Sequence, residues 1–387
     1  MEPRYIANNL PTQTLPSTKA HALLVQSLEA VLTNTPPLQR YTTRQLGGLY
    51  SGYTGIAYLF FRLSKRHPEL EVRGHCLNFW ASKYMEGDRS SAGLTKGNCG
   101  LACEKLSFQA LRACMSGKND DLFEFLANIP LLLGPYPSGD FYSSELIYGR
   151  AGLLYLIRMI EAYFPGSKSY LNSPKNCLTK KILETNDDGR GNWEWRGKRY
   201  FGAAHGEIGI ITQLVLANPK IAPRLHDRLE DLLDLQWEDG NWSSSELRMR
   251  EGKNPKLVQW CHGAPGFVIS LHSLREHFPE LESRIDTAIL RAEDIIWRHG
   301  LLTKEPSLCH GILGNALALP KGSKRNHFLS LATTESMEKM RRHDPTLFEP
   351  ASYDKDWAVM TNYYTSAAWA WATLEDETPR MIFYNDV

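Results

Sequence analysis

The sequence has almost no net charge and no long apolar segment. Its 387 residues include 44 Lys and Arg against 43 Asp and Glu, for a formal net charge of +1. Because proteins that bind nucleic-acid phosphates usually carry a clear basic excess, nucleic acid is not an expected partner. No stretch of 18 consecutive apolar residues predicts a transmembrane helix. Residues 1–16 also lack the basic and apolar regions of a secretory leader, so we expect a cytoplasmic protein.

Cysteine is scarce as well. The chain has seven cysteines, which is an odd number and too few for the disulfide framework of a secreted protein of this length. Reduced thiols would therefore be available for metal binding or for chemistry. Two of them, Cys261 and Cys309, occur in the same tripeptide, Cys-His-Gly, and in both places another Gly follows three residues after the first.

Strand signals are few, and 192–202 is the one stretch that resembles a short hairpin. A Gly-x-x-Gly pattern recurs instead, about every fifty residues, which is the mark of a repeat protein. One further step along the chain reaches 365–368, where small residues replace the glycines. The pattern therefore indicates seven units, and its clear copies begin at positions 52, 97, 149, 206, 263 and 311.

Each copy of the pattern precedes a largely apolar run, and amphipathic segments such as 222–235 and 280–297 lie between the copies. One buried helix and one amphipathic helix per unit describe a helical hairpin. Seven hairpins can close into a ring, whereas an open superhelix would leave the apolar inner helices uncovered. We therefore expect an all-α fold, a double α-toroid or (α/α)7 barrel, that spans residues 1–387 as a single domain. The glycines are interpreted as architecture, because they allow sharp turns and close helix approach.

Residues at the same offset from the first Gly should occupy equivalent places near the N-termini of the inner helices. His205, His262 and His310 directly precede that Gly in units four to six, and Cys261 and Cys309 precede two of these histidines. Two thiolates and an imidazole match the ligands that Zn²⁺ prefers, and helix N-termini favour the thiolate form. A closed Cys₂His₂ site that includes His262 is the alternative to an open site with three protein ligands.

An open fourth position would allow zinc to ionise a thiol from solution, which could add to an electron-poor alkene. That addition needs a proton donor, and His205 lies at the equivalent position in the neighbouring unit, unless it is only a structural histidine. Glu145, four residues before the Gly of unit three, could orient a catalytic group or act as a helix cap. Arg150, inside the same motif, could bind an anionic cofactor group or cap carbonyl oxygens.

Together these motifs make the chain resemble the LanC-like proteins, the eukaryotic relatives of the bacterial lanthionine cyclases. The resemblance covers nearly the whole chain and is carried by segments 48–59, 145–156, 194–210, 259–267 and 301–316. It implies seven inner and seven outer helices. It also implies one zinc ion held by Cys261, Cys309 and His310, with the fourth position left to a substrate thiol.

The resemblance further implies His205 as general acid or base and Glu145 in the place of a catalytic acidic residue. Eukaryotic members resemble enzymes that add glutathione to dehydroalanine or dehydrobutyrine in proteins, and Arg4 and Lys304 match positions that hold the glutathione carboxylates. Segment 353–371 departs from the family, because it lacks the usual arginine and Lys355 is its nearest cation. Segment 98–106 departs as well.

Two other functions compete with thiol addition. The first is a non-catalytic thiol-binding adaptor with a structural zinc. The second is a glycosidase-like toroid, which needs two acids across a central cleft. Glu145 and Glu207 are the only acidic candidates near the expected helix N-termini, and a glycosidase would leave both Cys-His-Gly cysteines unexplained.

Overall fold

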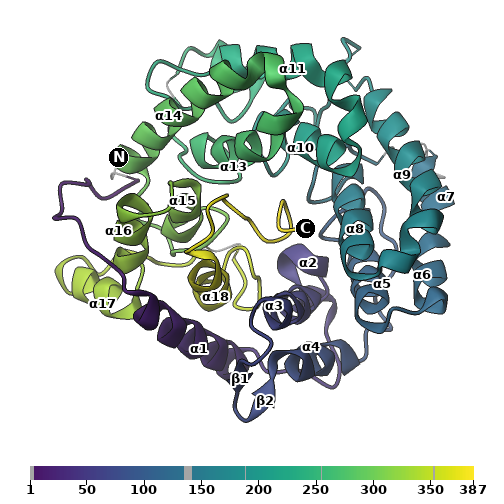
Figure 1. Cartoon of the computed structure of the whole chain (residues 1–387), viewed down its shortest axis with the longest axis horizontal. Coiled ribbons are helices and arrows are strands. Elements are labelled where there is room, and N and C mark those ends of the chain that lie inside the picture. The colour runs from purple at the N-terminus through teal and green to yellow at the C-terminus, as the bar shows by residue number, and fades with distance from the viewer. Residues whose placement is uncertain (1–3, 135–141, 188, 254, 352–353) are drawn as a thin grey trace.

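The computed structural model describes residues 4–134, 142–187, 189–253, 255–351 and 354–387. In these residues helices dominate, and the only strands are the two-residue pair β1 (Glu71–Val72) and β2 (His75–Cys76). Figure 1 shows the helices in two concentric rings. The predicted all-α toroid is confirmed.

The inner ring consists of one helix from each repeat unit. Each inner helix contacts the next one along the chain, and the last contacts the first, so the ring is closed as expected (Figure 1). Within the described residues its seven members are α3 (Tyr53–Arg66), α5 (Glu104–Ser116), α8 (Arg150–Tyr163), α10 (Glu207–Ala217), α13 (Ala264–Leu274), α15 (Ile312–Ala318) and α18 (Tyr363–Thr373).

An outer ring covers the inner one, and its first helix, α1, packs on the last inner helix, α18, so the two ends of the repeat array meet. Outer helices expose one face to solvent, and the exposed Leu290 lies on that face of α14. Inner helices are buried over nearly their whole length. Seven outer positions are described, two of them divided: α1 (Ser17–Asn34), α4 (Leu77–Glu86), α6 (Asn119–Leu126) with α7 (Ile129–Leu133), α9 (Lys168–Leu183), α11 (His226–Asp234), α14 (Glu282–His299), and α16 (Ser323–Leu331) with α17 (Thr334–His343).

The glycine motif has a common geometry in five units. The first Gly is the residue before the inner helix, and the second lies in its first turn. A Cβ on the second Gly would overlap the carbonyl oxygen of the residue six positions earlier, so only Gly lets the helix start against its own preceding loop. The pairs are Gly55 with Leu49, Gly152 with Leu146, Gly209 with Ala203, Gly266 with Trp260, and Gly314 with Leu308.

Units two and seven begin their inner helices differently from the expectation. Helix α5 is preceded by Cys103, three residues after Gly100, and a Cβ on Gly100 would instead press on the backbone of unit three at Ile147. Helix α18 is preceded by Asn362, whose side chain accepts a hydrogen bond from the Tyr364 backbone N–H. An Asn cap replaces the glycine there, and residues 365–368 lie inside the helix.

The end of the chain, residues 381–387, occupies the centre of the ring (Figure 1). The buried Asp386 carboxylate accepts hydrogen bonds from the hydroxyls of Tyr58 on α3 and Tyr155 on α8, at 2.7 and 2.9 Å. The Tyr384 carbonyl accepts from Gln213 on α10 at 2.9 Å and from Arg158 on α8 at 3.3 Å. These partners lie beyond the first turns of their helices, so the segment fills the ring away from the helix N-termini.

Two shorter α-helices lie in connecting segments: α2 (Gly48–Ser51) precedes α3, and α12 (Glu246–Arg250) lies in the loop between α11 and α13. Across the described ranges, no helix combines the length and the apolar character needed to cross a lipid bilayer.

Candidate metal centre and active site

The loops before α13 and α15 bring Cys261, Cys309 and His310 together. One ligand atom from each, all within 4.8 Å of one another, forms a buried cluster. The Cys261 backbone N–H donates to the Cys309 carbonyl at 3.2 Å, so the two loops are joined directly. The Cys309 N–H donates in turn to the carbonyl of Met360 at 2.8 Å, in the loop before α18. Three consecutive units thus hold the cluster in place.

The three groups shift one another's pKa values. A hydrogen bond from Cys309 and the neighbouring imidazoles of His262 and His310 hold the pKa of Cys261 well below its ordinary value, despite burial. The same bond and burial raise the pKa of Cys309, so the two thiols share one proton. Burial lowers the pKa of His310, but hydrogen bonds to Asp354 and Cys261 outweigh it and raise this pKa to about 9. Cys261 is therefore the more acidic of the two thiols, and a metal ion would have to displace the proton that the raised pKa keeps on His310.

Each of the three groups has a further polar partner. The Gln259 amide donates to the Cys261 sulfur at 3.0 Å, and the Tyr50 hydroxyl lies 3.4 Å from the Cys309 sulfur. Asp354 Oδ2 lies 3.2 Å from His310 Nε2, a contact in which a buried carboxylate orients the imidazole. Two sulfurs and an oriented imidazole are a donor set suited to Zn²⁺, so the residues fit the expected metal.

His262 lies outside this cluster. Its ring packs against Tyr200 and His205, with centroids 5.7 and 6.3 Å away. Burial lowers the pKa of His262, which favours the neutral ring, and its buried Nδ1 atom has no hydrogen-bond partner among the described residues. Of the two Cys-His-Gly histidines, His310 of unit six thus belongs to the cluster, whereas His262 of unit five packs against Tyr200 and His205.

A second pair of groups lies beside the cluster. His205 Nδ1 is 2.6 Å from Glu145 Oε2, and the carboxylate is almost fully buried. Two backbone N–H groups hold Glu145 in turn: that of Ile147 donates to Oε2 at 3.0 Å and that of Tyr148 donates to Oε1. The structure therefore brings together the two residues that were predicted to be catalytic, and the contact of Glu145 with His205 Nδ1 is the one that an orienting carboxylate would make.

Aromatic rings hold the other face of His205. Trp195 stacks on the imidazole with centroids 3.8 Å apart and planes 5° from parallel, and the Tyr148 ring lies parallel to both, with its centroid 6.2 Å from that of His205. Trp195 lies at a tight turn, where Arg196 and Gly197 both have positive φ and Trp195 pairs with Lys198. In place of the hairpin expected at 192–202 the structure has this one turn, which positions Trp195 against His205.

The chain belongs to the lanthionine synthetase C-like family. The family model described as "Lanthionine synthetase C-like protein" matches residues 45–327, well over half of the sequence. A zebrafish (Danio rerio) relative named "Glutathione S-transferase LANCL1" is 26% identical over 310 residues, which cover 76% of this chain and 73% of the relative. The Arabidopsis thaliana "LanC-like protein GCL1" is 32% identical over 205 residues, 48% of this chain and 43% of that protein.

In this LanC-like chain Arg150 caps carbonyl oxygens, which was the alternative to anion binding. The guanidinium is buried and donates to the carbonyls of Leu132 at 3.0 Å, Gly134 at 3.4 Å and Tyr142. These bonds join the start of α8 to the end of α7. They engage all three nitrogens of the side chain, so the structure gives Arg150 a structural position in place of the expected anion-binding one.

Arg4 and Lys304 come to the same edge of the ring. The Thr303 backbone N–H donates to the Arg4 carbonyl at 3.1 Å, and Ile6 N–H donates to Leu301 at 2.7 Å. Arg4 is thereby placed beside the residue that precedes Lys304. The positive charge of Lys304 also contributes to lowering the pKa of His262, so this edge adjoins the cluster.

Sequence reasoning did not find Asp354, Tyr50, Gln259 or Trp195. Asp354 lies one residue before Lys355, in the segment noted for its missing arginine; Lys355 itself donates to the Arg44 carbonyl at 3.3 Å. Trp195 and Gln259 lie inside segments that carried the family resemblance, so position within a motif was a signal for them. Tyr50 also lies inside such a segment, 48–59, and it has the offset from the first glycine of its unit that Cys261 and Cys309 have in theirs.

Proposed function

We propose that this LanC-like protein is a zinc enzyme that forms a thioether by adding a thiol to a dehydroamino acid. The observation that carries this proposal is the buried Cys261, Cys309 and His310 cluster next to an oriented His205–Glu145 pair. A glycosidase would need two acids across a cleft, whereas Glu207 is bound by Arg199 and Arg228 at 2.8 and 3.0 Å.

Cys261, Cys309 and His310 would hold the zinc ion. Asp354 binds Nε2 of His310, which leaves Nδ1 as the ligand nitrogen. When bound, Zn²⁺ would lower the pKa of a thiol in its remaining coordination position, so that a thiolate exists at neutral pH. Gln259 and Tyr50 would hold the two cysteine sulfurs in place by hydrogen bonds.

His205 would complete the addition. The thiol loses its proton to solvent, the sulfur bonds to the β-carbon as the carbon–carbon π bond breaks, and the π electrons move to the α-carbon and its carbonyl. The α-carbon then needs a proton, which His205 can deliver from Nε2 because Glu145 occupies Nδ1. After each addition His205 would regain its proton from solvent. Glu145 and Trp195 keep the imidazole in one orientation, so the proton is presented along a fixed direction.

Glutathione is the thiol that we propose, with cysteine as the related candidate. The zebrafish relative bears the name of a glutathione S-transferase, which supports this choice. Arg4 and Lys304, placed at one edge by the pairing of residues 4–6 with 301–303, offer two cations for the two glutathione carboxylates. The proposed electrophile is dehydroalanine or dehydrobutyrine in a peptide or protein, and the proposed compartment is the cytoplasm.

The test combines metal analysis with mass spectrometry. Purified protein should contain one zinc ion and should speed the addition of glutathione to a dehydroalanine peptide, seen as the mass gain of one glutathione. Cys309→Ala should lose zinc and activity, and His205→Ala should keep zinc and lose activity. Cys177→Ala and His343→Ala, which change an exposed thiol and an exposed imidazole, are the matched controls and should behave as the wild type.

A wild-type protein that binds zinc but accelerates no thiol addition to any of several acceptors would contradict the enzyme proposal. Glutathione binding that persists in that case would support the non-catalytic adaptor with a structural zinc. Absence of zinc from the purified protein, or zinc content unchanged in Cys261→Ala, would contradict both the zinc enzyme and the adaptor with a structural zinc.

A further inference from the structure

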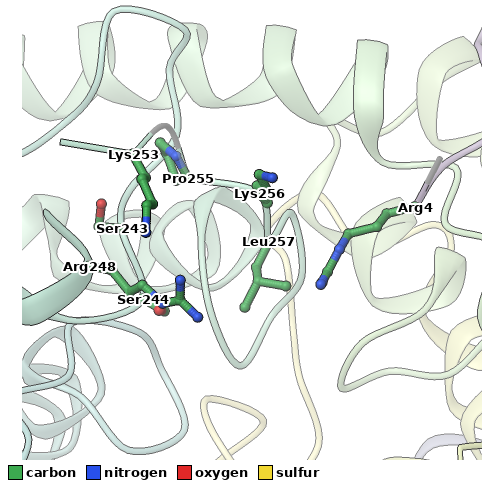
Figure 2. A pocket seen from close by; sticks show the side chains of 8 residues that line it. All are labelled: Arg4, Ser243, Ser244, Arg248, Lys253, Pro255, Lys256 and Leu257. Carbon is green, nitrogen blue, oxygen red and sulfur yellow. The ribbon is translucent and has the colours of Figure 1, made fainter. Parts of the chain in front are cut away.

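A second feature at the same end of the ring is a cavity of about 450 Å³ with a strongly basic lining. One wall comes from the loop that contains α12 and the other from the N-terminal segment (Figure 2). No acidic residue lines it among the described residues. We call it the basic pocket, and its lining consists of Arg4, Ser243, Ser244, Arg248, Lys253, Pro255, Lys256 and Leu257.

Backbone pairing joins the basic pocket to both halves of the candidate active site. Tyr200 pairs with Ser245, and the Phe201 N–H donates to the Ser244 carbonyl at 3.2 Å, so this wall continues into the loop that carries His205. The opposite wall, Arg4, pairs with residues before Lys304. Leu257 lies between the walls and is four residues before Cys261.

The positive charge of the basic pocket is largely uncompensated. Arg248 and Lys253 share one carboxylate, Glu251, at 3.6 and 3.3 Å. Arg4 and Lys256 form no ion pair with any described residue. Figure 2 shows the guanidinium groups of Arg4 and Arg248 directed into the space on either side of Leu257. Four exposed cations against one carboxylate make this a local positive field in a chain of net charge +1.

Glutathione does not account for all of these cations. Its two carboxylates need two cations, and Arg4 with Lys304 would supply them. Arg248, Lys253 and Lys256 belong to the side of the pocket opposite Arg4, and they remain available to bind a different anion. Nucleic acid is a poor occupant, because a single pocket of four cations offers little for a continuous phosphate backbone.

We propose that the basic pocket binds an acidic stretch of the polypeptide that carries the dehydroamino acid, through its Asp and Glu carboxylates. The chemical identity of that acceptor rests on the proposed function, whereas the binding of an acidic peptide does not. Arg248 offers paired N–H donors to one carboxylate, and Lys253 and Lys256 contribute flexible charges that suit variable sequences. The pocket thereby places residues that flank the acceptor beside His205 and the metal cluster.

Binding is tested first, without chemistry. Fluorescein-labelled peptides with alanine in place of dehydroalanine, flanked by either four Glu or four Gln, are titrated with zinc-loaded protein and followed by anisotropy. The Glu peptide should bind at least 10-fold more tightly than the Gln peptide at 50 mM salt. The difference should shrink several-fold at 500 mM salt, because exposed ion pairs are screened.

The triple variant Arg248→Glu, Lys253→Glu, Lys256→Glu should weaken Glu-peptide binding at least 10-fold and should leave zinc content unchanged. A control with the same change of charge, Lys118→Glu, Lys168→Glu, Lys220→Glu, alters exposed lysines elsewhere in the ring and should bind as the wild type. Equal affinity for the Glu and Gln peptides, or a triple variant within 2-fold of the control, would overturn the proposal.

Turnover separates this inference from the proposed function. With dehydroalanine peptides, the triple variant should raise KM for the Glu-flanked acceptor about 10-fold and leave KM for glutathione unchanged. A protein that binds acidic peptides in the predicted way but catalyses no addition refutes the enzyme and keeps the pocket. A protein that catalyses addition equally well with Glu and Gln acceptors keeps the enzyme and refutes the pocket.

Discussion

His205 Nδ1 lies 2.6 Å from Glu145 Oε2, although 60 residues separate them in the chain. Glu145 belongs to the loop before α8 and His205 to the loop before α10, so two neighbouring repeat units supply one acid–base pair. The carboxylate accepts two backbone N–H bonds, which fix its position toward the imidazole. Glu145 thus determines which nitrogen of His205 faces the substrate side.

Replacement of Glu145 by Gln should therefore lower the rate of thiol addition. The amide cannot stabilise a protonated imidazole, so we expect kcat to fall about 10- to 100-fold, while His205→Ala should cost about 100-fold or more. The measurement is steady-state addition of glutathione to a dehydroalanine peptide. Both variants should retain zinc and a wild-type melting temperature within a few degrees. A Glu145→Gln enzyme of wild-type activity would remove Glu145 from the mechanism.

Asp354 should set the affinity of the metal cluster. Its bond to His310 Nε2 orients the imidazole and makes the other nitrogen a better ligand. Asp354→Asn should weaken zinc binding about 10- to 100-fold, as expected for the partner of a ligating histidine. Competition with a chromogenic chelator measures this directly. Asp356→Asn, an exposed carboxylate two residues away, is the control, and equal zinc affinity in the two variants would show that the Asp354 contact does not support the metal.

The buried carboxyl of Glu305 should make the stability of the protein depend on pH. Burial raises the pKa of this carboxyl to about 7, although the Tyr363 backbone N–H donates to it at 2.8 Å. Because the folded protein holds this proton more tightly than the unfolded chain, the stabilising contribution is present below about pH 4.5 and is lost as the pH rises through about 7. The loss amounts to at most about 3 kcal/mol.

The variant Glu305→Gln keeps an acceptor for the Tyr363 N–H and carries no charge. Its stability relative to the wild type should increase between pH 5 and pH 8, measured by urea unfolding of the zinc-loaded proteins. Glu349→Gln, an exposed side chain whose backbone carbonyl accepts from the Glu305 N–H, should show no such trend. Parallel pH curves for the wild type and Glu305→Gln would mean that the buried carboxyl titrates normally.

The glycine geometry predicts a large cost for a very small substitution. A Cβ at Gly209 would overlap the Ala203 carbonyl oxygen, in the loop that also carries His205. Gly209→Ala should therefore lower the free energy of unfolding by about 3 kcal/mol or prevent folding, because a backbone carbonyl cannot move aside without shifting the loop. Gly93→Ala is the control, since no atom lies within 4 Å of the added methyl. Equal unfolding midpoints for the two variants would show that the loop relaxes freely.

The repeat made much of this protein predictable from sequence. Apolar runs after each Gly-x-x-Gly and amphipathic segments between them follow from local helix formation, and seven such units determine a closed ring. Equivalence within the repeat also directed Cys261, Cys309 and His310 to one place, which is where the structure puts them. The glycine pattern misplaced the starts of α5 and α18, because Cys103 precedes α5 and Asn362 precedes α18 in the place that the first glycine has in the other five units.

Tertiary structure alone decided which groups complete the site. The contacts of Asp354 with His310, of Trp195 with His205 and of Tyr50 with Cys309 join segments far apart in the chain, and no local pattern specifies such pairs. The carbonyl contacts of Arg150 and the joining of Arg4 to Thr303 have the same origin. The sequence by itself determined the helices and the convergence of the two Cys-His-Gly segments, since both follow from the periodicity of the repeat, whereas the choice of His310 over His262 came from the family resemblance. Closure of the ring determined the other contacts of the site, because it decides which of the loops before the inner helices lie next to one another.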